Sequence, residues 1–236
     1  MKAIIQNVIS FLKQGVNLVP DSSTENTQEV FISGYSTTSC DNQRCVLCRR
    51  PVGILYADVV DYSRLTEQDE EGTHHRLVEG MKIMEANVAA NDGRIAHYAG
   101  DAILAEFKDA DSALRCAINV QLAARQWNAN LGIAEQVLFR IGVNFGDVIA
   151  DHGDIFGNAV NLTARLEKLA RSGSICVSES VRQRLEDHPS FKFIAMGKQY
   201  LKNIREPVQA FWIEIDAQHI VDPDLAGVVK ISAVAS

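Results

Sequence analysis

The order of the periodic segments constrains the fold of this chain more than any other feature of the sequence. Residues 53–60 (GILYADVV) form an apolar run with a single acid near its end, which predicts a buried strand. Thr66 and the acidic residues after it predict the start of a helix that runs to about Asn91. The segments RIAHYA and AILAEF flank Gly100 and Asp101, which predicts a hairpin with a two-residue turn.

The second half of this region repeats the alternation of helix and strand. Residues 109–128 place small apolar side chains on one helical face, and residues 137–150 predict a long strand or a pair of strands. The order strand, helix, two strands, helix, strand fits a ferredoxin-like βαββαβ sandwich of the α+β class, in which one sheet has helices on one face. The remaining predicted elements are helices over 158–171 and 178–186 and strands over 174–178, 191–195, 199–201 and 208–215.

The chain divides into four parts. Residues 1–20 space their apolar side chains as one face of a helix, and residues 21–50 form a polar linker that ends in a cluster of cysteines. The periodic region over 51–216 reads as one domain, and residues 217–236 predict a weakly ordered tail. One main domain with an appendage also fits a length of 236 residues.

Charge and hydropathy narrow the class of partner. The formal net charge is -7 at pH 7, which argues against nucleic acid, since nucleic-acid surfaces need clustered Lys and Arg. A phosphate-bearing substrate is still allowed, because divalent metals supply positive charge locally. No apolar run reaches the roughly 18 residues of a transmembrane helix, and polar residues interrupt the N-terminal stretch where a signal peptide needs its apolar core. We therefore expect a cytoplasmic protein.

The cysteines favour a reducing compartment. There are five, and Cys40, Cys45 and Cys48 lie close together. Their spacing resembles the first three ligands of a plant-type 2Fe–2S site, but the fourth ligand would have to be Cys116, which we place on a core helix face. We expect free thiols in the linker, with Cys116 and Cys176 as small core residues. Redox sensing by the cysteine cluster is a weaker alternative.

Two acids are notable for their positions. Asp58 lies at the end of a strand that is otherwise apolar, and Asp101 lies in the turn of the hairpin. In a ferredoxin-like sheet the first strand and this hairpin are central neighbours, so the two side chains can meet at one edge. Converging carboxylates at a strand end are typical of a Mg²⁺ or Mn²⁺ site, since hard cations take oxygen ligands and share them with substrate phosphates. Each acid alone has an ordinary alternative, as a helix cap or a turn residue.

The most specific indication of function is a set of five segments that occur in a fixed order. They are ADVVDYSRL, GRIAHYAGDAILAEF, FRIGVNFGDVI, GDIFGNAVNLTARLE and QYLKNIREPVQAFWI. Together, over about residues 49–215, they resemble the catalytic domain of class III adenylyl and guanylyl cyclases. The resemblance implies an enzyme that converts a nucleoside triphosphate to its 3′,5′-cyclic monophosphate and pyrophosphate.

The resemblance also implies how the metal and the phosphates are bound. Asp58 and Asp101 resemble the two metal-binding aspartates, assisted by the backbone carbonyl of Val59. Two Mg²⁺ or Mn²⁺ ions per site would activate the 3′-hydroxyl and neutralise the leaving pyrophosphate. Lys202 resembles the lysine that contacts the triphosphate.

The loop over 59–66 is a second predicted phosphate-binding segment. It runs from a strand into a helix N-terminus, where backbone amides and positive dipole ends favour anions. We therefore expect Tyr62 and Ser63 to lie against the substrate.

Asn161 and Arg165 resemble the pair that orients the ribose and stabilises the transition state. They lie four residues apart on a predicted helix and so share a face, and a planar guanidinium suits the charge on the α-phosphoryl group. In the family, this pair and the metal aspartates come from different protomers. This chain has both sets, which predicts a symmetric homodimer with two sites. The alternative for Arg165 is a solvated helix charge paired with Glu167 or Glu135.

Base recognition is implied for His97 and Asp154. His97 occupies the place where adenylyl members usually have a lysine, and neutral imidazole offers one donor and one acceptor. An ionised Asp154 accepts hydrogen bonds and so favours a base with an exocyclic amino group, which leads us to predict ATP. The same fold includes pyrimidine cyclases of bacterial anti-phage systems, so CTP or UTP stays open. The ordinary alternative for His97 is a half-buried strand residue.

Asp61 departs from the family pattern. Relatives usually have Gly at this position, where a positive φ and close approach of phosphate are easy. Asp61 places a negative charge beside a polyanion, so a catalytically weak module that binds a nucleotide or a partner is the alternative function.

Overall fold

The computed structural model describes residues 48–215. The predicted N-terminal helix, the predicted linker up to residue 47 with Cys40 and Cys45, and the predicted tail from 217 lie outside the described residues. In chain order the elements are β1 (Cys48–Val59), α2 (Tyr62–Gln68), α3 (Glu70–Ala90), β2 (Arg94–Ala99), β3 (Ala102–Phe107), α4 (Ala110–Asn128), the 3₁₀ turn η1 (Ile133–Glu135), β4 (Phe139–Asp151), β5 (Asp154–Phe156), α5 (Asn158–Leu169), β6 (Ile175–Ser178), α6 (Glu179–Leu185), β7 (Phe193–Gln199) and β8 (Val208–Ile213).

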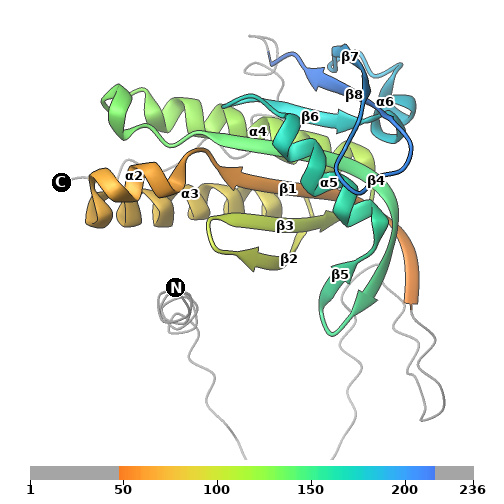
Figure 1. The fold of residues 1–236 in the computed structure, drawn as a ribbon, viewed down its shortest axis with the longest axis horizontal. Helices are drawn as coiled ribbons and strands as arrows, with labels where there is room; N and C mark the ends of the chain where they lie inside the picture. Colours follow the sequence, from red (N-terminus) through yellow and green to blue (C-terminus); the bar gives the residue numbers. More distant parts are fainter. Residues whose placement is uncertain (1–47, 216–236) are drawn as a thin grey trace, which may run out of the picture. The chain divides into compact units, whose positions relative to one another are not determined.

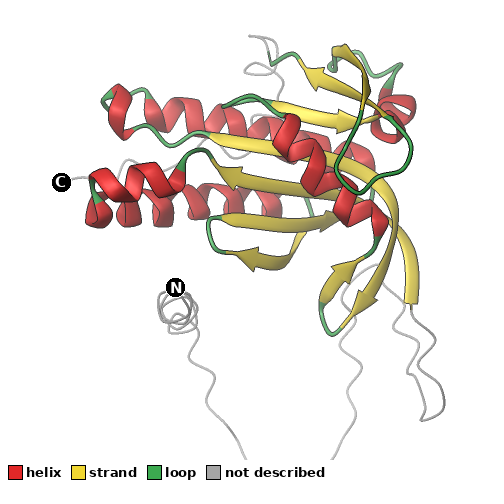
Figure 2. Ribbon diagram, in the orientation of Figure 1, coloured by secondary structure: helices red, strands yellow, loops and turns green. Residues whose placement is uncertain are grey.

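The strands form one mixed sheet with a ferredoxin-like centre (Figures 1 and 2). Their order is β2-β3-β1-β4-β6-β8-β7, and the short β5 pairs with β4. Strand β1 lies antiparallel between β3 and β4, and β6 is added parallel to β4. The predicted ferredoxin-like α+β sandwich is confirmed, and the first strand and the hairpin are central neighbours as expected.

Helices α3, α4 and α6 lie on one face of the sheet, which we call the covered face. Alternate residues of the central strands point into this layer, and Leu55, Phe139 and Ile141 are buried there. The predicted apolar face of α4 is confirmed, because its members are all buried in the same cluster. Those members are Ala113, Cys116, Ala117, Val120 and Ala124.

Helix α5 packs on the opposite face, in front of the sheet in Figure 1, and we call this the site face. Gly142 of β4 allows the approach, because a Cβ at this position would clash with the backbone of Thr163 and Glu167. The two helices of the βαββαβ order, α3 and α4, share one face as predicted, and α5, which follows that order, covers the other. Its amphipathic pattern indicates that it packs on a sheet, but does not indicate which face it covers.

The first helical region differs from the prediction at its start. Thr66 was expected to begin the helix, but α2 begins at Tyr62, and the extended residue Asp69 separates it from α3. The Asp69 carboxylate accepts a hydrogen bond from the Gly72 amide at 2.9 Å, which caps α3. The acidic cluster is thus the first turn of a second helix rather than of the first.

Three strand boundaries also differ. Strand β1 begins at Cys48, which pairs with Ala150, so Cys48 belongs to the sheet and not to a linker. The separate strand predicted over 199–201 is wrong: β7 continues to Gln199 through an irregularity after Ala195, and a loop follows. The short strand β5 was not predicted, because three residues are too few to show a period.

The two cysteines of the described core are placed as predicted. Cys116 and Cys176 are fully buried, and burial raises the pKa of the Cys176 thiol to about 12. Cys116 lies in the apolar cluster of the covered face. None of the helices between residues 48 and 215 has the length and hydropathy of a bilayer-spanning segment.

Candidate active site

The structure brings Asp58 and Asp101 together at the end of β1. The Val59 amide donates to the Asp101 carbonyl at 3.3 Å, which ties the hairpin turn to the strand end. Burial, and then the charge of Asp58, raise the pKa of the Asp101 carboxyl to about 6. A carboxyl whose ionisation is disfavoured by burial and by a neighbouring carboxylate marks a place that attracts a cation.

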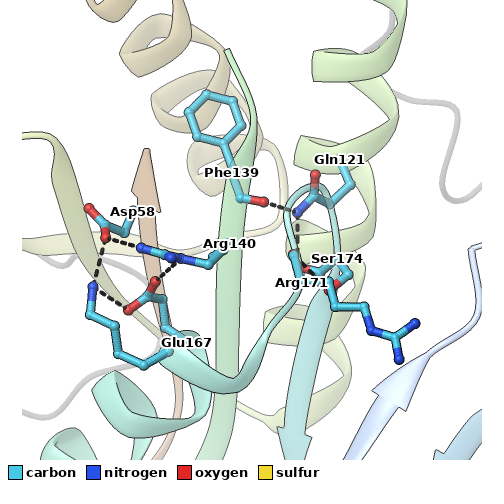
Figure 3. A network of polar contacts seen from close by, with 8 residues as sticks. Asp58, Gln121, Phe139, Arg140, Glu167, Arg171 and Ser174 are labelled. Atoms are coloured by element: carbon cyan, nitrogen blue, oxygen red, sulfur yellow. Dashed lines mark hydrogen bonds and ion pairs between the residues drawn. The ribbon is translucent and has the colours of Figure 1, made fainter. Parts of the chain in front are cut away.

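Two basic side chains meet the same carboxylate (Figure 3). The Asp58 Oδ2 atom accepts from Arg140 Nη2 at 3.0 Å and from Lys168 Nζ at 2.8 Å. Glu167 joins both bases, with Arg140 Nε 2.8 Å from its Oε1 and Lys168 Nζ 3.0 Å from its Oε2. The four side chains form one alternating network of charge.

The network follows from the pairing of the strands and the placement of α5. Arg140 of β4 is the Cα partner of Asp58, so both side chains lie on the site face. The close approach of α5 over Gly142 buries Glu167 completely beside them. Burial is the largest influence on Arg140 and opposes its charge, but the neighbouring carboxylates outweigh it and raise its pKa. Burial is also the largest influence on Glu167. There it raises the pKa of the carboxyl, against the hydrogen bond from Lys168.

Sequence reasoning did not find Arg140, Glu167 or Lys168 as site residues. Glu167 was considered only as a partner of Arg165, and it pairs instead with Arg140 and Lys168. One feature of the sequence does point to Arg140: it is a charged residue inside an apolar strand, and a buried charge needs a partner. Its partners lie 27 and 82 residues away, and no local pattern identifies them.

His97 and Asp154 lie together at the β2–β5 side of the site face. Nδ1 of His97 is 3.3 Å from Oδ2 of Asp154, and Oδ1 of Asp154 accepts from the Ile155 amide at 2.7 Å. An irregularity in β2 between Ile95 and His97 sets the histidine opposite Leu104 of β3. The His97 side chain is 55% exposed, so the expectation of a half-buried strand histidine does not hold.

Asn161, Arg165 and Lys202 are available for contacts outside the chain. Asn161 and Arg165 lie on α5, and the exposed Lys202 lies in the loop between β7 and β8. Within residues 48–215, the side chains of these three residues make no hydrogen bond or ion pair. The expected alternative for Arg165, a pair with Glu167 or Glu135, is therefore not formed there.

Part of the phosphate-binding loop predicted over 59–66 is already hydrogen-bonded within the chain, and part of it is helical. The amides of Val59 and Val60 are bonded to the Asp101 and Leu138 carbonyls, so they are not open to a ligand. Tyr62 and Ser63 form the first turn of α2. Asp61 occupies the N-cap position of this helix without a side-chain capping bond, at φ 54° and ψ 31°, the left-handed conformation that Gly adopts most easily.

The donor set fits a divalent metal that is shared with a substrate. Across residues 48–215, no group of three or more His, Cys, Asp or Glu side chains is arranged as a closed metal site. Asp58 and Asp101 would offer two carboxylates to such an ion, and Mg²⁺ is commonly held by one or two carboxylates together with substrate phosphates. An open site of oxygen ligands is what such an ion requires.

A family match covers all of this region. The family described as adenylate and guanylate cyclase catalytic domain matches residues 48–215. A protein of Rhizobium meliloti (strain 1021) that has an adenylate cyclase name is 37% identical over 161 residues, which is 68% of this chain and 27% of that protein. An adenylate cyclase of Streptomyces coelicolor is 33% identical over 146 residues, 61% of this chain and 36% of that protein. The chain thus spans well under half the length of these two relatives.

Solved structures show the same fold. An adenylate/guanylate cyclase/hydrolase from Silicibacter pomeroyi has a TM-score of 0.64 and 39% identity, over 72% of this chain and 99% of that chain. The adenylyl cyclase CyaB from P. aeruginosa has a TM-score of 0.63 at 23% identity, over 71% and 95% of the two chains, and supports the fold alone.

Proposed function

Because this chain belongs to the adenylate and guanylate cyclase catalytic domain family, we propose that it converts ATP to 3′,5′-cyclic AMP and pyrophosphate. The observation that carries the proposal is the meeting of Asp58 and Asp101 at the end of β1. A cyclase must bind a highly charged triphosphate, and a pair of acids on an otherwise apolar strand end serves this purpose through metal ions.

We assign the binding of the metal ions to Asp58, Asp101 and the backbone carbonyl of Val59. Two Mg²⁺ or Mn²⁺ ions at this place would lower the pKa of the ribose 3′-hydroxyl and neutralise the leaving pyrophosphate. The three metal-binding groups would hold the ions and, through them, the triphosphate. Arg140 bonds to Asp58, and its guanidinium would suit phosphate oxygens bound to the same ions.

We assign the ribose and the α-phosphoryl group to Asn161 and Arg165 of a second copy. Both side chains lack partners within residues 48–215, which suits residues that act across an interface. Phe156 and Tyr200, 48% and 86% exposed, provide apolar surface near Asp154 and Lys202 that a second copy would bury. An isologous dimer would build two such sites, and Lys202 would contact the triphosphate.

Adenine is the base that the candidate site favours. Asp154 is already fixed by the Ile155 amide, and its second oxygen lies beside His97. A fixed carboxylate acceptor favours the exocyclic amino group of adenine over the carbonyl of guanine or uracil. The relatives from Rhizobium meliloti and Streptomyces coelicolor are both named as adenylate cyclases, which supports the same choice.

The test is to incubate the purified chain with each of ATP, GTP, CTP and UTP in the presence of Mn²⁺ or Mg²⁺, and to measure cyclic product. We expect cyclic AMP as the main product. No cyclic nucleotide above a heat-inactivated control would reject the cyclase and leave a nucleotide-binding module. A larger yield of cyclic CMP or UMP would reject the base assignment alone.

The shared site has its own test. Protein with Asp101→Asn and protein with Arg165→Ala should each be inactive, because each lacks one half of every site. After mixing and exchange, half of the dimers are mixed and each has one complete site, so about a quarter of wild-type activity should return. Activity that does not return on mixing, in protein that light scattering shows to be dimeric, would contradict the composite site.

A further inference from the structure

Lys168 has no part in the proposed reaction, although it touches the residue on which that reaction depends. Its ammonium lies 2.8 Å from Asp58 Oδ2 and 3.0 Å from Glu167 Oε2. The same Asp58 oxygen accepts from Arg140 at 3.0 Å. One oxygen of a candidate metal ligand is thus already in contact with two positive charges.

The two cations differ in how firmly they are held. The Arg140 side chain is 25% exposed, projects from a central strand, and is fixed between Asp58 and the fully buried Glu167. The Lys168 side chain is 53% exposed and lies in the last turn of α5 on a flexible four-carbon stem. When its ammonium turns into water, Arg140 still pairs both Asp58 and the buried Glu167, whereas loss of the guanidinium would leave Glu167 with the exposed lysine alone.

A divalent ion that binds Asp58 and Asp101 has to share the Asp58 carboxylate with these bases. A positive charge within about 4 Å repels such an ion strongly at the low effective dielectric of a partly buried site. Lys168 is the more exposed of the two and has the flexible stem, so it is the base that can give up Asp58 to an ion.

We infer that Lys168 is an internal counter-ion of Asp58, which a divalent cation must displace in order to bind. Lys168 is then a positioning residue that sets the metal affinity of the site by competition. This inference depends on the proposed metal role of Asp58 and Asp101, and it adds a residue that weakens the binding of free metal.

The test is the affinity of the full chain for Mn²⁺ in the absence of nucleotide, measured by the electron paramagnetic resonance signal of free Mn²⁺. Lys168→Gln should bind Mn²⁺ about 3- to 10-fold more tightly than wild type, since it removes an ion pair of a partly exposed side chain. Lys168→Arg keeps the charge and should bind no more tightly than wild type. If Lys168 only supported the structure, Lys168→Gln would bind Mn²⁺ more weakly than wild type, and Lys168→Arg would restore the affinity.

Lys82→Gln is the matched control for the loss of one positive charge. Lys82 forms an ion pair with Glu79 at 2.8 Å on α3, and its side chain is 60% exposed, close to the value for Lys168. Its Mn²⁺ affinity should equal that of wild type. Equal gains in both variants, or no gain with Lys168→Gln in protein whose circular dichroism is unchanged, would overturn the inference.

A double variant locates the ion that is measured. Adding Asp101→Asn to Lys168→Gln should abolish the tighter binding, and tight binding that persists would place the ion elsewhere and overturn the inference. Cyclase activity is measured on the same samples. Wild type that makes no cyclic nucleotide while Lys168→Gln gains affinity would refute the reaction but not the counter-ion, and an active wild type without that gain would refute the counter-ion alone.

Discussion

Along β1, Leu55, Ala57 and Val59 point into the covered face, whereas Tyr56 and Asp58 point to the site face. One strand therefore contributes to two surfaces of opposite character. The covered face is closed by three helices over apolar side chains, while the site face combines smaller apolar clusters with paired charges. The period of two along a strand is what allows this division.

The difference shows which face stabilises the fold. On the site face Glu106 is bonded to Arg50 at 2.7 Å and to Arg94 at 2.6 Å, and Glu167 is bonded to Arg140 at 2.8 Å. Buried ion pairs of this kind contribute little net stability, because desolvation offsets their attraction. The apolar layer of the covered face has to supply the stability that lets the other face hold charges for a ligand.

The largest effect on stability is expected on the covered face. Phe139→Ala removes a fully buried ring that lies against Gly80 of α3, and should destabilise the fold by about 3–5 kcal/mol. Urea unfolding measures the change. Lys202→Ala, on an exposed loop, is the control and should change stability by less than about 0.5 kcal/mol. A loss below about 1 kcal/mol for Phe139→Ala would contradict the assignment of stability to this face.

The largest effect on activity is expected on the site face. Asp101→Asn removes a proposed metal ligand and should lower the proposed cyclase activity at least about 100-fold, which is roughly 2.7 kcal/mol of barrier. Stability should not fall, because the Asp101 charge is disfavoured by burial and by Asp58. The exposed Asp187→Asn is the matched control and should keep full activity. An active Asp101→Asn enzyme would show that the metal site is elsewhere.

The sequence predicted the covered face better than the site face. Small residues such as Ala113 and Ala117 recur at helical spacing, so the buried face of α4 was predictable from local pattern alone. The hairpin with Asp101 was predicted to the residue, because its two strands and turn are contiguous. Local period and turn chemistry therefore account for most of the elements.

The rest depends on contacts that are distant in sequence. Lys168 and Asp58 are 110 residues apart, and their contact exists only because α5 packs on the face opposite to α4. Gly142 decides that packing through the absence of a side chain, and a single glycine gives no period. The charge network was missed for this reason, whereas Asp58 and Asp101 were found through strand order and the family motifs.

A smaller effect is expected on the pH dependence of stability, which Asp101 on the site face should cause. The folded pKa of Asp101, about 6, lies above its ordinary value of 3.8, so its contribution to stability is complete below pH 3.8 and is lost as the pH rises through about 6. The stability of Asp101→Asn relative to wild type should therefore rise between pH 3.8 and 6, on the order of 1 kcal/mol after screening at this partly exposed site. Urea unfolding at several pH values without divalent metal measures it. A pH-independent difference would contradict the shifted pKa.

The smallest effect is expected at Asp61, where the site face meets the backbone. Its side chain is 59% exposed, makes no helix-capping hydrogen bond, and lies 3.7 Å from the exposed Arg64, so it adds little to stability. Asp61→Gly relieves the left-handed conformation but loosens the unfolded chain, and these terms should cancel to within about 0.5 kcal/mol. Activity should rise about 2- to 5-fold at low nucleotide if the triphosphate binds beside Asp58 as proposed, because a negative charge close to it is removed. Asp61→Asn separates the two causes in a KM measurement: it removes the charge yet tolerates the same backbone, so a gain with Gly but none with Asn would assign the effect to backbone conformation and contradict the electrostatic explanation.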